Sequence, residues 1–191
     1  MIEGSRVLLR PIRDEDWSKF EEWGKSREAL WGPFQRFQMD HLPLLREAYQ
    51  KTGLLKRESG FLLIETIEDQ QLLGFVRYSM LNLPDADLPY PEVGFGIPEV
   101  NARGEGYAQE AVRLLVEYLF AGYPVERVAA FTDDENKPAQ RVLEGVGFQR
   151  EGVLRRAMFR DGQWRDVAIY GILRHKVGAK SWSKREREEK K

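Results

Sequence analysis

The 191-residue sequence contains no cysteine and only two histidines, His41 and His175, which lie far apart in the chain. The absence of cysteine excludes a disulfide framework, a thiolate metal site and a cysteine nucleophile. Two distant histidines give little support to a histidine-based zinc site or to a catalytic triad. We therefore expect no bound metal and no covalent intermediate on a protein thiol.

The chain also lacks an excess of charge of either sign, because 30 Lys and Arg residues balance 31 Asp and Glu residues. A dedicated duplex-nucleic-acid binder normally carries a strongly basic face or domain, so nucleic acid is not an expected partner. No apolar run approaches the length of a membrane span, and the first residues lack the long apolar segment of a signal peptide. We expect one cytoplasmic domain with a full core and no membrane partner.

What the sequence does contain is centred on residues 91–120, PEVGFGIPEVNARGEGYAQEAVRLLVEYLF, which predict a strand, a glycine loop and a helix. Residues 93–97 form a short apolar run. From Ala108 onward apolar residues recur at helical spacing, and charged residues, Glu110 among them, take the other face. A helix that begins in a glycine loop presents unpaired N–H groups and a partial positive charge. Such a loop suits a phosphate or pyrophosphate, and Arg103 adds a cation beside it.

Two familiar phosphate-binding loops do not fit the spacing. A Walker loop ends in Gly-Lys-Ser/Thr, which is absent, and a dinucleotide fingerprint needs a third glycine where Gln109 stands. The pattern R/Q-x-x-G-x-G/A does fit, at Arg103, Gly106 and Ala108. The segment thus resembles the pyrophosphate loop of the GCN5-related N-acetyltransferase (GNAT) superfamily. A glycine-rich turn that merely enters a helix is the alternative interpretation.

A second segment, about 30 residues further on, extends the resemblance. Residues 136–148 read NKPAQRVLEGVGF and resemble the superfamily pattern N-x-x-S/A-x-x-V/L-L/Y-E-x-x-G-F. Asn136 is expected to cap a helix, and Gly147 to end it in a left-handed conformation. A capped helix alone would not predict both motifs at this separation, so together they favour the superfamily.

The beginning of the chain resembles the RimJ/RimL-type branch of that superfamily. Residues 6–11 read RVLLRP and are followed by Asp16, as in the branch's opening R-L-x-L-R-P-x-x-x-x-D. Asp14 or Asp16 is a candidate N-cap for the amphipathic helix that follows. Residues 161–176, DGQWRDVAIYGILRHK, similarly resemble the ending D-G-x-x-x-D-x-x-x-Y-x-x-L.

The resemblance implies a single GNAT domain over residues 1–176 with a mixed α+β fold. Its central sheet would be twisted and mostly antiparallel, with six to seven strands, splayed at the fourth and fifth strands and flanked by about four helices. A hairpin is expected at residues 61–66 and 72–81, and the Asp-Gly pair at 161–162 predicts another. Residues 177–191 are rich in charge and are expected to form a flexible tail.

The activity implied by the resemblance is transfer of the acetyl group of acetyl-CoA to a primary amine in a ternary complex. The acceptor would be a small molecule or a protein amino terminus. The backbone of strand 93–97 would pair with the pantetheine, and an N–H near Ile97 would polarise the thioester carbonyl. The residues assigned to the cofactor in this way are Phe95, Gly96, Ile97, Arg103, Gly104, Glu105, Gly106, Tyr107, Ala108, Asn136, Ala139 and Arg141.

Glu92, just before this strand, lies where the superfamily often keeps a catalytic carboxylate. An alkylammonium is protonated at neutral pH and only the free amine attacks, so a base is needed. Glu92 is expected to act directly or through water, although a carboxylate that precedes a strand is otherwise an ordinary surface charge. Asp133 and Asp134 are reserve candidates, and their expected role is to cap the turn before Asn136.

The usual acids for the leaving thiolate are missing. Leu143 stands where many members have a tyrosine, and Ala139 stands where the RimJ/RimL branch often has a serine. A water, Tyr170 or no acid at all would then serve. Two other functions remain open: a catalytically silent acyl-CoA-binding regulatory module, and a ribosome- or protein-interaction domain.

The acceptor itself is set, in the resembled superfamily, by the region that corresponds to residues 24–60. Trp31, Phe34 and Phe37 in this region, together with Tyr170, are candidate residues of an acceptor pocket. A satellite hydrophobic cluster under a long connection is the alternative interpretation of these aromatics. Exposed aromatics here would also permit a dimer, so both a monomer and a homodimer remain open.

Overall fold

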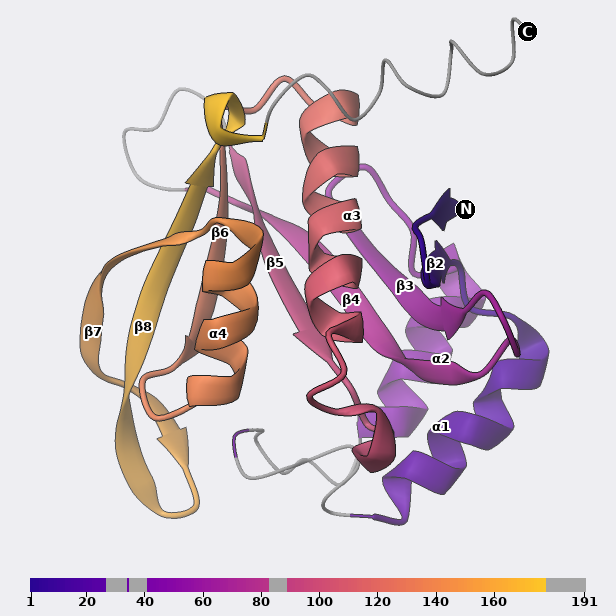
Figure 1. Ribbon diagram of the computed structural model, residues 1–191. Coiled ribbons are helices and arrows are strands. Elements are labelled where there is room, and N and C mark those ends of the chain that lie inside the picture. The colour runs from indigo at the N-terminus through magenta and orange to yellow at the C-terminus, as the bar shows by residue number, and fades with distance from the viewer. Residues whose placement is uncertain (27–33, 35–40, 83–88, 178–191) are drawn as a thin grey trace, which may run out of the picture.

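The computed structural model describes residues 1–26, 34, 41–82 and 89–177 (Figure 1). They form a mixed α+β fold around one eight-stranded sheet with the order β1-β2-β3-β4-β5-β6-β8-β7. The strands are β1 (Ile2–Glu3), β2 (Val7–Arg10), β3 (Ser59–Thr66), β4 (Leu72–Leu81), β5 (Tyr90–Gly96), β6 (Arg127–Asp133), β7 (Gln149–Arg160) and β8 (Gln163–Leu173). The sheet exceeds the expected six to seven strands because the two-residue β1 adds to its edge.

Four α-helices are described within these residues, and they cover both faces of the sheet. They are α1 (Trp17–Gly24), α2 (His41–Thr52), α3 (Tyr107–Gly122) and α4 (Lys137–Val146), with short 3-10 turns at Asp14–Asp16, Val100–Ala102 and Arg174–Lys176. Along β3, Leu62 and Ile64 pack in the core with α3 and α4, whereas Phe61 and Leu63 pack with α1 and α2. This alternation is the period-two pattern of a strand buried on both faces.

The turn between β1 and β2 is held by Glu110 on α3. Glu110 was expected on the exposed face of the helix, and this prediction is wrong: the residue is buried. Its carboxylate accepts hydrogen bonds from the N–H of Arg6 and the hydroxyl of Ser5, each at 2.9 Å, and from the N–H of Ser5. The charge is thus compensated by donors from the other end of the sequence, which fixes β1 at the edge of the sheet.

Arg10 and Asp16, two residues of the opening pattern, belong to a buried cluster of ion pairs. Asp16 is the N-cap residue of α1, one of the two predicted positions, but its side chain makes no cap hydrogen bond to the helix. Instead its two oxygens accept from the guanidinium of Arg10 at 2.8 Å each, and Oδ2 also accepts from the N–H of Arg13 at 2.7 Å. Arg10 donates to Glu65 on β3 as well. The cluster therefore joins β2, β3 and the start of α1.

The neighbouring strands β5 and β6 are the only parallel pair described, and they separate along their length. They pair at just two positions, the last of which joins Val93 to Ala130. On its other side β5 pairs with β4 over all seven residues of Tyr90–Gly96. Within the described residues, the backbone from Gly94 to Gly96 therefore has a strand partner on one side only. The expected splay is confirmed, and it falls at β5 and β6 here because β1 precedes them.

The last two strands, β7 and β8, form a hairpin. Asp161 and Gly162 connect the strands, with φ angles of 49° and 74°, as in the tight turn that the Asp-Gly pair predicts. Residues 178–191, which include nearly all of the predicted tail, lie outside the described residues. No described helix is both long enough and apolar enough to cross a membrane.

Candidate active site

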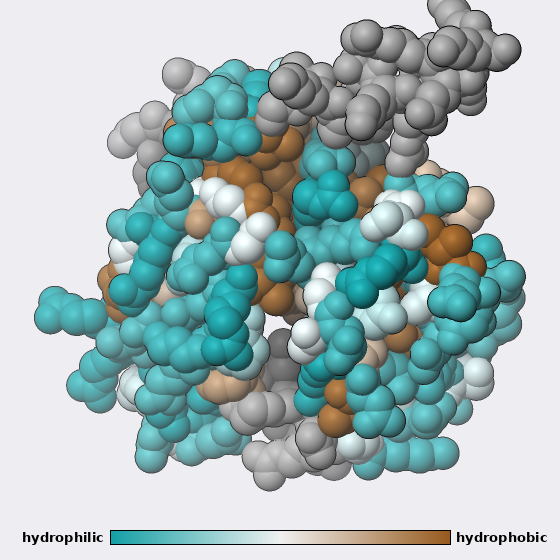
Figure 2. Space-filling model, viewed as in Figure 1, coloured by the Kyte–Doolittle hydropathy of each residue, from teal (hydrophilic) through white to brown (hydrophobic). Residues whose placement is uncertain are grey.

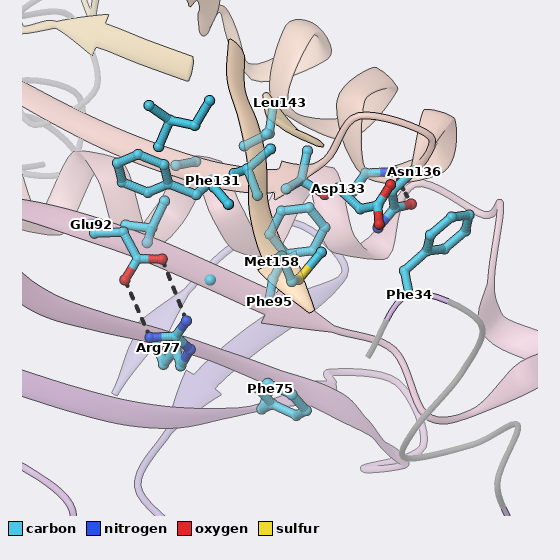
Figure 3. A pocket seen from close by; sticks show the side chains of 18 of the residues that line it. Phe34, Phe75, Arg77, Glu92, Phe95, Phe131, Asp133, Asn136, Leu143 and Met158 are labelled. Carbon is cyan, nitrogen blue, oxygen red and sulfur yellow. Dashed lines mark hydrogen bonds and ion pairs between the residues drawn. The ribbon is translucent and has the colours of Figure 1, made fainter. Parts of the chain in front are cut away.

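A cavity of about 570 Å³ lies in the gap between β5 and β6 (Figure 3). On the face covered by α3 and α4, the surface is hollowed between the loop before α3 and the first turns of α4 (Figure 2). The cavity wall is mainly aromatic and aliphatic, and the polar residues among those that line it are Arg77, Glu92, Thr132, Asp133 and Asn136.

Two helix N-termini meet at one edge of this gap. β5 and β6 run in the same direction, and α3 and α4 begin beyond their carboxyl ends (Figure 1). Gly104 and Gly106 precede α3 with φ angles of 85° and 86°, a left-handed backbone that favours glycine. The N-cap of α3, Gly106, provides no side-chain hydrogen bond to the first turn. The N–H groups of that turn are therefore suited to an anion.

Two arginines hold the glycine loop. Arg103 donates from Nε to the carbonyl of Ile97 at 2.7 Å, which ties the loop to the end of β5. Arg6 donates to the carbonyl of Glu105 at 2.8 Å, and its guanidinium lies 4.6 Å from the ring centre of Tyr107. The sequence pattern indicated Arg103 but not Arg6, because Arg6 reaches the loop from the other end of the chain.

The α4 motif contributes part of the opposite wall. Asn136 accepts the N–H of Ala139 through Oδ1 at 3.2 Å, so its predicted capping role is confirmed. Asn136 and Ala139 both line the cavity, as does the buried Leu143. Arg141 is exposed on α4 and does not line the cavity. Gly147 ends the helix with a φ of 110°, as predicted.

Glu92 faces the cavity from β5 and is largely buried. Its carboxylate accepts from the hydroxyl of Ser79 at 3.2 Å and from the guanidinium of Arg77 at 3.3 and 3.4 Å (Figure 3). The sequence prediction missed Arg77. The alternation of side chains in β4 could have indicated it, because Phe75, Arg77 and Ser79 share one face of the strand. That face therefore carries a cation beside an aromatic ring.

Two glycines of β5 make room for the side chains of β4. A Cβ on Gly94 would lie 2.8 Å from Nε of Arg77, and a Cβ on Gly96 would lie 2.9 Å from the ring of Phe75. Because residues 92, 94 and 96 share one face of the strand, both side chains cross β5 on the face that carries Glu92. The two glycines of the sequence E-x-G-x-G thus leave room for Arg77 and Phe75 to lie across the strand.

The reserve base candidates are engaged elsewhere. Asp133 lines the cavity, but its carboxylate forms a buried ion pair with Arg160 and accepts the N–H of Glu135 at 2.8 Å. The second bond confirms its predicted role in the turn. Asp134 pairs with Arg150. Each of the two carboxylates is thus paired with an arginine.

Of the four predicted acceptor residues, one lines the cavity, one does not, and two lie outside the described residues. Phe34 lines the cavity, and the guanidinium of Arg160 lies 5.3 Å from its ring centre. Trp31 and Phe37 lie outside the described residues. Tyr170 does not line the cavity, so its predicted role as an acceptor or acid residue is wrong: it is fully buried in the core of the sheet.

The environment of Tyr170 explains why it is unsuited to acid chemistry. Its hydroxyl donates to Glu144 on α4 at 3.0 Å. Burial, reinforced by this carboxylate, raises the pKa of Tyr170 to about 12. Among the described lining residues, Thr132 has the only hydroxyl group. In the described part of the chain, no group of three or more His, Asp or Glu residues is placed to hold a metal ion.

Comparison with known proteins identifies similar chains over most of this length. The family model described as "Acetyltransferase (GNAT) domain" matches residues 6–149. The "Probable N-acetyltransferase YjcK" of Bacillus subtilis is 27% identical over 178 residues, which cover 91% of this chain and 97% of that protein.

Two solved structures share the fold. Mycobacterium smegmatis RimJ in complex with CoA-disulfide superposes with a TM-score of 0.72 at 23% identity, covering 89% of this chain and 83% of that one. Spermidine N-acetyltransferase from Vibrio cholerae in complex with CoA and spermine has a TM-score of 0.72 at 22% identity, covering 91% and 99%. Both likenesses show that the described chain has the fold of these structures.

Proposed function

Because this chain belongs to the acetyltransferase (GNAT) family, we propose that the cavity between β5 and β6 is its active site, where a primary amine receives the acetyl group of acetyl-CoA. N-acetyl transfer is the activity of the family. The observation that carries the site assignment is that the splayed strands and Glu92 line one gap in the sheet, and that the glycine loop lies beyond the end of β5 at its edge (Figure 1).

The residues present fit acetyl-CoA, which supplies the acetyl thioester when it is bound. The unpaired edge of β5 between Gly94 and Gly96 offers backbone donors and acceptors to the amides of pantetheine. The first turn of α3, with the loop from Gly104 to Gly106, offers N–H groups to the pyrophosphate. Arg6 and Arg103 fix that loop and add positive charge beside it.

The chemistry of the proposed reaction requires a free amine. We assign Glu92 the role of base, directly or through a water, because it is the carboxylate in the described wall that faces the gap beside the exposed edge of β5. The amine nitrogen bonds to the acetyl carbon, and the carbon–sulfur bond breaks. Glu92 takes one proton from the bound ammonium before the attack. The sulfur then leaves with the electron pair, and the second proton lost by the nitrogen passes through water to the thiolate. A backbone N–H of residues 95–97 stabilises the charge that develops on the carbonyl oxygen.

The leaving thiolate needs no strong acid in this scheme. A simple thiol has a pKa of about 8.5, so its anion is a tolerable leaving group near neutral pH. The side chains of Ala139 and Leu143 cannot donate a proton. We therefore assign protonation of the thiolate to water.

The test of the proposed function is release of the CoA thiol from acetyl-CoA with a panel of primary amines and amino-terminal peptides. We expect turnover of at least one class of amine, with a 1:1 ratio of thiol to acetylated amine by mass spectrometry. Binding of acetyl-CoA without acetylation of any amine would overturn the proposal in favour of a silent acyl-CoA-binding module.

A further inference from the structure

The Arg77–Glu92 pair is loosely joined and half open to the cavity. The side chain of Arg77 is 47% exposed, against 12% for that of Glu92. The contacts of 3.3 and 3.4 Å are longer than the roughly 2.7–2.9 Å of strong charge-assisted hydrogen bonds. Within the described residues the guanidinium donates to Glu92 alone, so further N–H donors of its five are available to a ligand.

The place of Arg77 is built into the sheet. Gly94 stands opposite it on β5, and a Cβ there would lie 2.8 Å from Nε and 3.1 Å from Cζ of the guanidinium. Any larger residue at position 94 would displace the guanidinium from Glu92. In this wall a positive and a negative group therefore lie side by side, facing the same gap (Figure 3).

A side-by-side guanidinium and carboxylate is complementary to a zwitterion. An α-amino acid has its ammonium and its carboxylate on neighbouring atoms of one tetrahedral carbon. When its carboxylate accepts hydrogen bonds from Arg77, its amine is brought next to Glu92, the proposed base. Arginine suits this role because Nε and the outer N–H groups of its terminal nitrogens, which do not face Glu92, can donate to a second carboxylate.

The remaining wall is mainly apolar, apart from Thr132, Asp133 and Asn136. Phe61 and Phe75 are stacked with ring centres 4.9 Å apart, and Met158 and Leu154 line the cavity from β7. The other carboxylate in the described lining, that of Asp133, forms an ion pair with Arg160. A polyamine, which carries several positive charges and no negative one, would meet an exposed guanidinium and no second available carboxylate in this wall.

From these contacts we propose that the acceptor is an α-amino acid with an apolar or aromatic side chain, held by its carboxylate at Arg77. The inference rests on the proposed function, since it names the substrate class of the same site. Acetyl transfer to the α-nitrogen then yields an N-acetylamino acid and CoA. Arg77 is a specificity-determining residue, because a simple amine gains nothing from it.

The test compares matched acceptors that differ in the carboxylate alone. L-Leucine is set against L-leucinamide and 3-methylbutylamine, and L-phenylalanine against L-phenylalaninamide and 2-phenylethylamine, with spermidine as the polyamine. The variants are Arg77→Gln and Gly94→Ala, and the control is Arg113→Gln, a half-exposed arginine on the outer face of α3. Calorimetric titration of L-phenylalanine into each protein measures binding independently of turnover.

We expect kcat/KM to be at least about tenfold higher for the free amino acids than for their matched amines. Arg77→Gln should lower it about 10- to 100-fold for the amino acids, the usual effect of losing a charged hydrogen-bond partner. The loss should be smaller for the amines, which are affected only through the contact between Arg77 and Glu92. Gly94→Ala should act in the same direction because it displaces the guanidinium without removing it. Both should weaken L-phenylalanine binding, whereas Arg113→Gln should not.

Other outcomes separate this inference from the proposed function. Acetylation of simple amines, spermidine or peptides with no preference for free amino acids would overturn the inference and leave the proposed function in place. An equal loss for amino acids and matched amines in Arg77→Gln would also overturn it, since a structural defect affects both. If no amine is acetylated but L-phenylalanine binds through Arg77, the ligand class stands and the proposed function falls.

Discussion

Arg160 of β7 and Asp133 of β6 form an ion pair from which solvent is almost entirely excluded, with 5% and 1% of their side chains exposed. Asp133 also accepts the N–H of Glu135, two residues further along the turn that leads into α4. The same carboxylate therefore joins the long hairpin to the turn before Asn136. Arg160 in addition lies over the ring of Phe34, so the pair supports two parts of the cavity wall.

Asp133→Asn is expected to destabilise the protein by about 3 kcal/mol, because Arg160 loses its buried counter-charge and keeps only the half-exposed Asp161, 3.6 Å from Nε. The double variant Asp133→Asn with Arg160→Met should lose less than the sum of the two single variants. Urea denaturation measures both quantities. Lys51→Gln, which breaks an exposed pair with Glu47 on α2, should change the stability by no more than about 0.5 kcal/mol. Strict additivity of the two single variants would contradict the pairing.

The Glu110 carboxylate should make stability depend on acid pH. Burial alone would raise the pKa of Glu110, but hydrogen bonds from the N–H of Arg6 and from Ser5 outweigh it and hold the pKa below its usual range. A lowered pKa contributes stability that is present above the unfolded value, about 4.3, and is lost as the pH falls through the folded value.

We therefore expect Glu110→Gln to be less stable than the wild type at neutral pH, by about 1–3 kcal/mol, and the difference to shrink as the pH falls below about 4. Urea midpoints measured at a series of pH values check this. Glu126→Gln, at an exposed position, provides the matched control. A difference between the Glu110 variant and the wild type that stays constant with pH would mean that the charge of Glu110 is not involved.

Gly106→Ala tests the glycine loop. Its φ of 86° places alanine in a left-handed conformation, which costs an L-residue about 1–2 kcal/mol. We expect the loop to shift, the KM for acetyl-CoA to rise several-fold and kcat to change little, as steady-state kinetics will show. Gly122→Ala, near the end of α3 with open space around it, should stabilise the protein or leave it unchanged. Equal effects of both variants on KM would contradict a local role for the loop.

The parts of the fold that the sequence predicted are those with a local cause. The Asp-Gly pair at 161–162 predicts its turn because both positions adopt positive φ angles. Asn136 and Gly147 predict the ends of α4 because a cap needs only its own neighbours in sequence. The glycine loop, through Arg103 and Gly106, similarly predicts where α3 begins. Each of these features depends on a few consecutive residues, so it can be predicted without knowing the order of the strands in the sheet.

The features that were missed depend on residues distant in sequence. Glu110 has the helical position of a surface residue, and only the return of Ser5 to α3 makes it buried. Asp16 is spaced correctly for a helix cap, but the buried Arg10 competes for it more effectively. Tyr170 has a hydroxyl group that could act as an acid, but its side chain points from β8 into the hydrophobic core. Long-range contacts override local propensity in each case.

The bulge in β7 is a further feature without a local signal. The pairing of β7 with β8 shifts between Leu154 and Met158, where Arg156 has a φ of 52° and donates its N–H to Asp166 at 2.8 Å. The extra residues bend the strand, and Leu154 and Met158 on both sides of the bulge line the cavity. No glycine or proline stands in residues 154–158. The shape of this wall is therefore known only once the strands are paired.

Glu92→Gln is expected to lower kcat by about 10²- to 10⁴-fold near neutral pH, because the variant cannot take a proton from the ammonium. The deficit should shrink as the pH rises, since solvent then deprotonates a growing share of the amine before it binds. Measuring kcat against pH for the wild type and the variant, with one amine at saturation, checks this. Glu126→Gln, which removes an exposed carboxylate near the start of β6, should match the wild type throughout. A ratio of variant to wild type that stays constant up to the pKa of the amine would assign Glu92 to positioning, through Arg77 and Ser79, and not to proton transfer.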